Sequence, residues 1–171
     1  MFDETFEGSS MEHTHPTVHP NEFDVIITDI GKKSIASIGR YLEIENLSPA
    51  TGSVAFPVNG TMHGAGLRIF FGLVATTKKS SVNVLFLMDT SSPSTHLCQD
   101  TLEALGFTES ISGHTIVNIH GTTVQVYPSR GQFKNVNLLG QDYLRQAQLH
   151  VVLNYADFTA VILKVAPMGT M

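Results

Sequence analysis

Short apolar runs of strand length follow one another along most of the chain, and this pattern limits the possible fold more than any other feature. The runs are rich in β-branched and aromatic residues, and polar turn residues separate them. Three neighbouring pairs predict β-hairpins: Leu67–Ala75 with Ser81–Met88, Thr115–His120 with Thr122–Tyr127, and Leu149–Tyr155 with Phe158–Val165. The sequence therefore predicts a sheet built mainly from hairpins.

Helical signals are few. Gln99–Leu105, ended by Gly106, and Gln141–Gln148, opened by Gly140, are the two segments predicted to be helices. Strands are also predicted for Phe23–Ile30 and for Tyr41–Glu45, where apolar and polar residues alternate. The predicted fold class is all-β, mainly β with two short helices.

The bulk composition restricts partners and compartment. With 171 residues, 42% of them hydrophobic, the chain can form one compact domain plus an extra segment. A net charge of −5 disfavours nucleic acid or an anionic membrane as the main partner. The single cysteine, Cys98, is interpreted as a small buried hydrophobe rather than a reactive thiol. Without a visible signal peptide or membrane-length apolar run, an intracellular, cytoplasmic protein is expected.

The first 22 residues are polar and read as a flexible N-terminal tail. They carry His13, His15 and His19, but no cysteine or carboxylate cluster surrounds these histidines to prepare a metal geometry. We interpret them as part of a solvated tail, and neither a metal nor a cofactor is expected.

Asp89 stands at the end of an apolar strand and is followed by small hydroxyl residues, Thr90, Ser91 and Ser92. A carboxylate in that place is costly to desolvate unless the next loop donates backbone N–H groups to it. Small polar residues allow such a tight turn. Taken alone, the segment fits either an ordinary strand-to-turn aspartate or a functional one.

A second segment, Val136-Asn-Leu-Leu-Gly-Gln-Asp-Tyr-Leu144, places an apolar pair and a glycine before a short helix, and the strand ending in Leu153-Asn154-Tyr155 follows it. Together and in this order, the two segments resemble those of retropepsins and their cellular and retroelement relatives. The resemblance covers about 67–165. Asp142 itself is interpreted as a carboxylate that stabilises the N-terminus of its helix.

This resemblance implies a retropepsin-like closed β-barrel half-fold that works as a homodimer. By it, Asp89 is the catalytic aspartate, Thr90 hydrogen-bonds its counterpart across the dimer axis, and Ser91 is the third residue of the motif. Two such carboxylates would share a proton and activate a water to hydrolyse a polypeptide substrate, as in aspartic proteases generally. No metal or organic cofactor is implied.

Two departures from the family pattern bear on activity. Ser91 stands where the family nearly always has glycine, so its side chain enters a crowded site, and a left-handed backbone there would be strained. Gly140 follows Asp89 by only 51 positions, which leaves room for about one hairpin, Thr115–Tyr127. That hairpin either completes the sheet, so that no flap covers the substrate, or is itself the flap, with His120-Gly121 at its tip.

The predicted organisation is a tail (1–22), an N-terminal β extension (23–66), a retropepsin-like domain (67–165) and a C-terminal tail (166–171). Two functions remain open: an aspartic endopeptidase, of retroelement type, or a catalytically inactive retropepsin-fold module for assembly. In the second, the N-terminal region would bind a protein partner. Whether residues 1–66 are a pro-segment, a small subdomain or a docking arm also stays open.

Overall fold

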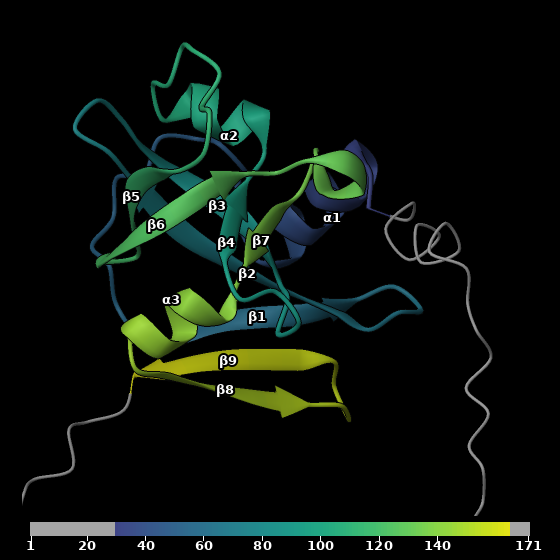
Figure 1. The fold of residues 1–171 in the computed structure, drawn as a ribbon. Coiled ribbons are helices and arrows are strands. Elements are labelled where there is room, and N and C mark those ends of the chain that lie inside the picture. Colours follow the sequence, from purple (N-terminus) through teal and green to yellow (C-terminus); the bar gives the residue numbers. More distant parts are fainter. Residues whose placement is uncertain (1–29, 165–171) are drawn as a thin grey trace, which may run out of the picture.

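The computed structural model describes residues 30–164 and is dominated by strands (Figure 1). In chain order the elements are α1 (Lys32–Tyr41), β1 (Val58–His63), β2 (Arg68–Thr76), β3 (Ser81–Met88), β4 (Thr95–Leu97), α2 (Gln99–Ala104), β5 (Thr115–Ile119), β6 (Thr122–Pro128), the 3₁₀ turn η2 (Gly131–Phe133), β7 (Asn137–Leu139), α3 (Gln141–Gln146), β8 (Leu149–Asn154) and β9 (Thr159–Lys164). Within this part of the chain, no helix is long and apolar enough to cross a membrane.

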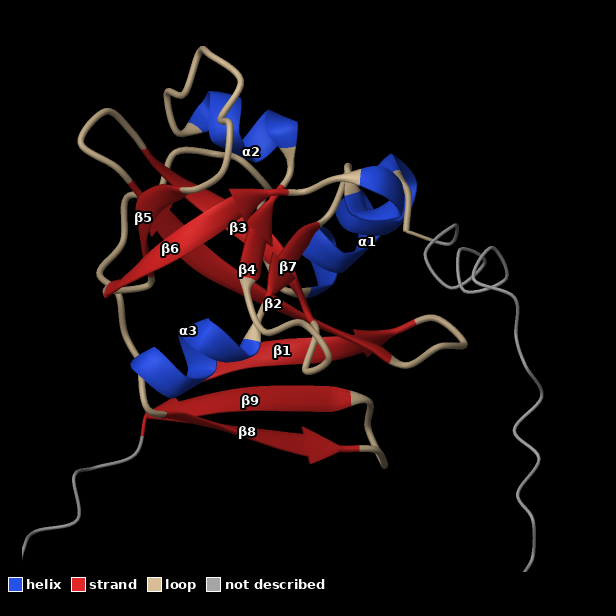
Figure 2. Cartoon of the chain, viewed as in Figure 1, coloured by secondary structure: helices blue, strands red, loops and turns tan. Residues whose placement is uncertain are grey.

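Six strands close on themselves into a barrel. Their order around it is β3-β7-β4-β6-β5-β2, and a further pairing of β2 with β3 completes the ring. β1 pairs with β2 and continues the sheet through β9 to β8, which lies at the free edge (Figure 2). The fold class predicted from the sequence, mainly β with a closed barrel, is confirmed.

The strand alternation divides the buried side chains into two layers. On β3, Val82, Val84 and Phe86 point into the barrel, whereas Leu85 and Leu87 point outward. The outer residues pack with Ile38 of α1, so helix and barrel share a second apolar cluster. Burying each large aliphatic side chain contributes about 1.5–3 kcal/mol, so both layers stabilise the fold.

The N-terminal region differs from the prediction. The strand expected at Tyr41–Glu45 is wrong, because Tyr41 ends helix α1 and no strand follows at once. Ile35, Ile38 and Leu42 recur at helical spacing and all pack against the outer cluster. Residues 30–164 thus contain three short α-helices where two were predicted. The strand predicted for Phe23–Ile30 lies outside the described residues except for Ile30.

The three predicted hairpins are confirmed, with strand ends that differ by at most one residue. The helices predicted to begin at Gln99 and Gln141 are also present. The short strand β7 was not predicted as a strand from the sequence, and neither was β1. β1 lies in the segment predicted to be an N-terminal extension and pairs with both β2 and β9.

Candidate active site

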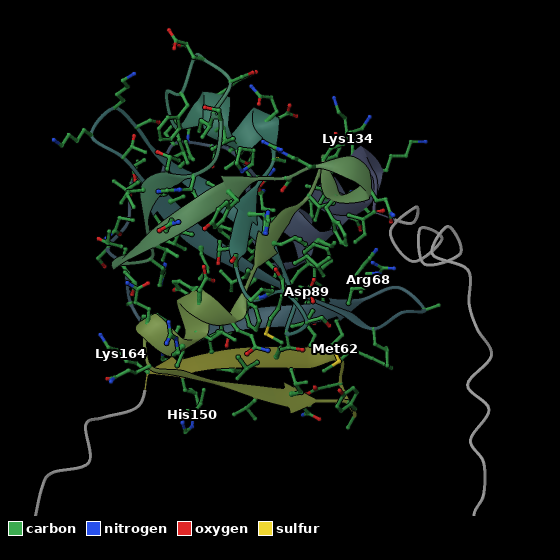
Figure 3. The ribbon with its side chains drawn as sticks, in the orientation of Figure 1. Met62, Arg68, Asp89, Lys134, His150 and Lys164 are labelled. Atoms are coloured by element: carbon green, nitrogen blue, oxygen red, sulfur yellow. The ribbon has the colours of Figure 1, made fainter. Side chains whose placement is uncertain are left out.

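Asp89 directly follows β3 and starts a tight loop. Its backbone N–H donates to Leu139 O on β7 at 3.1 Å, so the β3–β7 ladder continues one residue beyond the strand. The N–H of Ser91 donates to Asp89 Oδ1 at 2.9 Å, and that of Ser92 donates to Asp89 O at 3.2 Å. Figure 3 shows Asp89 near the centre of the molecule. The loop thus satisfies one carboxylate oxygen through backbone and leaves the side chain half-buried.

The start of α3 holds this loop from the other side. Gln141 N donates to Ser92 O at 2.9 Å, Asp142 N donates to Pro93 O at 3.2 Å, and the Gln141 side-chain amide donates to Thr90 O. Gly140 lies so close that a Cβ there would stand 2.4 Å from the carbonyl carbon of Ser94. The two segments noted in the sequence therefore meet in space.

Asp142 fastens the base of the loop. Its Oδ1 accepts the Thr95 hydroxyl at 2.7 Å, and its Oδ2 accepts the Thr95 backbone N–H at 3.0 Å. Thr95 Oγ1 in turn accepts the N–H of Gly140 at 3.1 Å. Asp142 does lie in the first turn of α3, as predicted, but its bonds to Thr95 were not foreseen. No sequence pattern pointed to these bonds, because Thr95 and Asp142 lie 47 positions apart.

The face of the barrel beside Asp89 is apolar. Alternation along β3 puts Leu87 and Asp89 on the same side, and Leu87 is paired with Phe70 on β2 and Leu138 on β7. These three side chains are buried in the outer cluster with Ile38 of α1. The N-terminal extension therefore covers part of the wall next to the aspartate.

On the neighbouring strands β4 and β6, the side chains on the same side of the sheet are less buried. His96 on β4 pairs with Leu138 and with Tyr127 on β6, and both rings are half-buried, with centroids 5.7 Å apart. These two side chains are therefore less buried than Phe70, Leu87 and Leu138.

The β5–β6 hairpin belongs to the barrel and is not a flap. β5 pairs with β2 and β6 pairs with β4. His120, at the hairpin turn, is buried, and its Nε2 lies 2.9 Å from Ala55 O. His120 N also bonds Val74 O, and Val74 pairs with Asn83, six residues before Asp89. At about 3.3 Å per residue, the turn is roughly 20 Å along the sheet from the aspartate.

The two other predicted site residues flank Asp89. Both Thr90 and Ser91 are exposed. Ser91 is not among the residues with positive φ, so the left-handed strain that a serine would suffer there does not arise. Cys98 is buried, with Sγ 3.3 Å from Thr101 Oγ1, which fits the structural interpretation.

No metal centre is formed within residues 30–164, where no group of three or more His, Cys, Asp or Glu side chains is suitably placed. The histidines His13, His15 and His19 lie outside the described residues.

The sequence matches no protein-family model and no curated protein. Among solved structures, the chain is similar to the crystal structure of a retropepsin-like aspartic protease from Rickettsia conorii. The two share 15% sequence identity, with a TM-score of 0.44, over 66% of this chain and 95% of the other.

Proposed function

We propose that this protein is an aspartic endopeptidase whose active site forms between two copies of the chain. The observation that carries the proposal is the Asp89 loop. Its half-buried carboxylate, at a strand end, accepts the N–H of Ser91, and hydrogen bonds from the start of α3 to the loop carbonyls hold the loop itself. Such bracing holds a reactive carboxylate in place before substrate binds.

One chain supplies one strand-end Asp-Thr loop, so the dyad requires Asp89 and the partner's Asp89. At about 3 Å apart, two carboxylates cannot both ionise easily and would share a proton. The ionised one removes a proton from a water, which attacks the peptide carbonyl. The protonated one polarises that carbonyl and then donates to the leaving amine. The titration belongs to the pair.

The neighbouring residues have roles in the same proposal. The exposed Thr90 hydroxyl would donate to the partner's loop and tie the two loops together. Ser91 directs its N–H to Asp89 and fixes the carboxylate orientation. Gln141 holds the Thr90 carbonyl, which keeps the Thr90 hydroxyl at the dimer axis.

The test is cleavage of a denatured protein by the wild type, Asp89→Asn and a matched Asp100→Asn control. Asp100 is an exposed acid in α2, so its substitution removes the same charge elsewhere. We expect activity in the wild type and control and none in Asp89→Asn. Equal cleavage by Asp89→Asn would remove this residue from the mechanism.

The second candidate is a catalytically inactive module that assembles with other proteins. Two observations favour it: the β5–β6 hairpin is held in the barrel rather than over Asp89, and α1 covers part of the adjacent wall. Substrate clamping and water exclusion would then have to come from elsewhere. This candidate predicts no cleavage by any variant, and binding of a partner through the N-terminal region.

A further inference from the structure

A large cleft opens between helix α1 and the barrel, which we call the α1 cleft. Its volume is about 900 Å³. One wall is the face of α1 that carries Lys32, Ala36 and Arg40, and another is formed by residues 135–137, at the start of β7. α1 packs on the outside of the barrel against β3 and β7 (Figure 1). Asp89 does not line this cleft, so the α1 cleft is distinct from the candidate active site.

The lining of the α1 cleft includes apolar side chains that are incompletely covered. Leu85 and Val136 are buried, whereas Ile35, Ile44 and Leu47 are only half-buried. Covering such aliphatic surface with a further apolar group is favourable by about 25 cal/mol per Å². A concave site of this size that combines apolar lining with a few polar groups is typical of a binding site. The cleft therefore suits an occupant with several apolar side chains.

The chain enters the described structure at the wall of the α1 cleft. Ile30 lines the cleft, is only 8% exposed, and packs with Ile38 and Val136 in the outer cluster. The next residue, Gly31, is extended, with φ of −114° and ψ of −179°, and α1 begins directly after it. The residues that precede Ile30 are thus tethered at the cleft itself, and their docking there costs little loop-closure entropy.

The seven residues before Ile30 match the cleft in chemistry and length. They read Phe-Asp-Val-Ile-Ile-Thr-Asp over 23–29, and Phe, Val and the two Ile are apolar. In extended form, seven residues span about 23 Å. The part of α1 that lines the cleft, from Lys32 to Arg40, is about 12 Å long. The segment is therefore long enough to turn back and cross the cleft.

The charges favour the same pairing. Residues 1–29 hold seven of the 15 acids of the chain and none of its 10 lysines and arginines. Lys32 and Arg40 are exposed cations on the α1 wall, and they offer opposite charge to the aspartates of the segment. Three acids also line the cleft, two in the linker after α1 and one in α2. The segment's carboxylates are accordingly expected on the α1 side.

We propose that residues 23–29 dock in the α1 cleft of their own chain. The apolar side chains of the segment cover Ile35, Ile44 and Leu47, and the segment clamps α1 to the barrel. This assigns the N-terminal region the role of an arm that docks in cis, one of the roles that its sequence left open. The inference goes beyond the proposed function, because it needs neither a second copy of the chain nor catalysis.

The experiment uses the full chain, which contains no tryptophan, so Phe23→Trp places a single fluorescent indole in the segment. Quenching by acrylamide then measures how accessible that ring is. Two further substitutions, each made in the Phe23→Trp chain, put a charge into the cleft from different walls: Ala36→Asp and Asn135→Asp, both at exposed residues. Ser37→Asp is the matched control, because Ser37 is an exposed residue of α1 that does not line the cleft.

We expect the ring to be protected from acrylamide in Phe23→Trp alone and together with Ser37→Asp. Pockets bury roughly 70–90% of the surface of a bound group, so the quenching constant should rise about three- to tenfold when either cleft variant displaces the segment. Circular dichroism checks that every variant keeps the helix and strand content of the wild type.

Equal quenching in all four proteins would overturn the proposal, because the ring would then be free or buried elsewhere. Exposure by Ser37→Asp, or by only one of the two cleft variants, would also overturn it, since the protection would not come from the cleft. Protection that is lost on dilution from about 100 to 1 μM would assign the segment to the cleft of a second copy, and docking in cis would be wrong. Cleavage enters none of these readouts, so the result is independent of the peptidase.

Discussion

Gly140→Ala is the sharpest test of the loop bracing, because a single methyl group enters the contact between the two halves of the site. The added Cβ would lie 2.4 Å from both C and O of Ser94 and 2.9 Å from Thr95 N. Since carbon atoms pack at about 3.5–4.0 Å, the loop has to retreat by about 1 Å. The atoms in the way are backbone, so no side chain can simply rotate aside.

The cost follows from the bonds that this retreat stretches. Gly140 N to Thr95 Oγ1, Gln141 N to Ser92 O and Asp142 N to Pro93 O all cross the same contact. Losing two of them costs about 1 kcal/mol each, and the overpacking itself adds roughly 1–3 kcal/mol. We expect the free energy of unfolding to fall by about 3–5 kcal/mol, which lowers the melting temperature by roughly 6–20 °C in a chain of this size.

The assay is thermal unfolding followed by circular dichroism, with Gly52→Ala as the control. A Cβ at Gly52 meets nothing within 4 Å and its φ is not positive, so that variant should melt within about 0.5 kcal/mol of the wild type. Cleavage by Gly140→Ala should drop on the order of 100-fold, because Asp89 is displaced with its loop. Equal melting temperatures for the two variants would refute the proposed bracing.

Three further substitutions test other parts of the structure. Tyr143→Phe should raise the free energy of unfolding by about 1 kcal/mol in urea titrations. The reason is that the fully buried Tyr143 hydroxyl has no hydrogen-bond partner among the described residues, and its burial raises the pKa of Tyr143. A loss of stability would mean that the hydroxyl does have a hydrogen-bond partner. Asp142→Ala should lower the free energy of unfolding by about 2–3 kcal/mol, since it leaves the buried Thr95 hydroxyl and N–H without their acceptor. An unchanged urea midpoint would contradict a stabilising role for the two Thr95–Asp142 hydrogen bonds. Ser91→Gly should raise the rate of cleavage if the serine only crowds the dyad. It should also lower the free energy of unfolding by about 0.5–1 kcal/mol, because glycine adds backbone freedom to the unfolded chain. No cleavage by either protein would favour the inactive module.

The hairpins could be predicted because each is local: two apolar runs and a short turn specify their own pairing. The His120-Gly121 turn, for instance, has positive φ at both residues, as a two-residue hairpin requires. Helix α1 was missed because Ser37 and Gly39 interrupt the stripe of Ile35, Ile38 and Leu42, which gains its stability only against the barrel. Its apolar side chains stabilise little until Leu85 and Leu87 lie beneath them.

The candidate site was predicted only in part. Asp89, Thr90 and Ser91 could be marked because the strand end and the small residues are adjacent in the sequence. The bond between Thr95 and Asp142 joins residues 47 positions apart, and no local pattern specifies it. The role of the β5–β6 hairpin likewise depended on which strands β5 and β6 would pair with, a long-range choice that its own sequence does not determine.

The insertion of β7 between β3 and β4 also determines when the candidate site can form during synthesis. Asp89 N bonds to Leu139, which the ribosome adds 50 residues later. Closing a loop of that length costs on the order of 3–4 kcal/mol of chain entropy, which is regained only after β7 and the start of α3 are both present. A nascent chain that ends before Gln141 therefore carries the Asp89 loop without the hydrogen bonds from β7 and α3 that hold it. If the protein is a peptidase, the order of its strands keeps it from cutting neighbouring chains while it is being made.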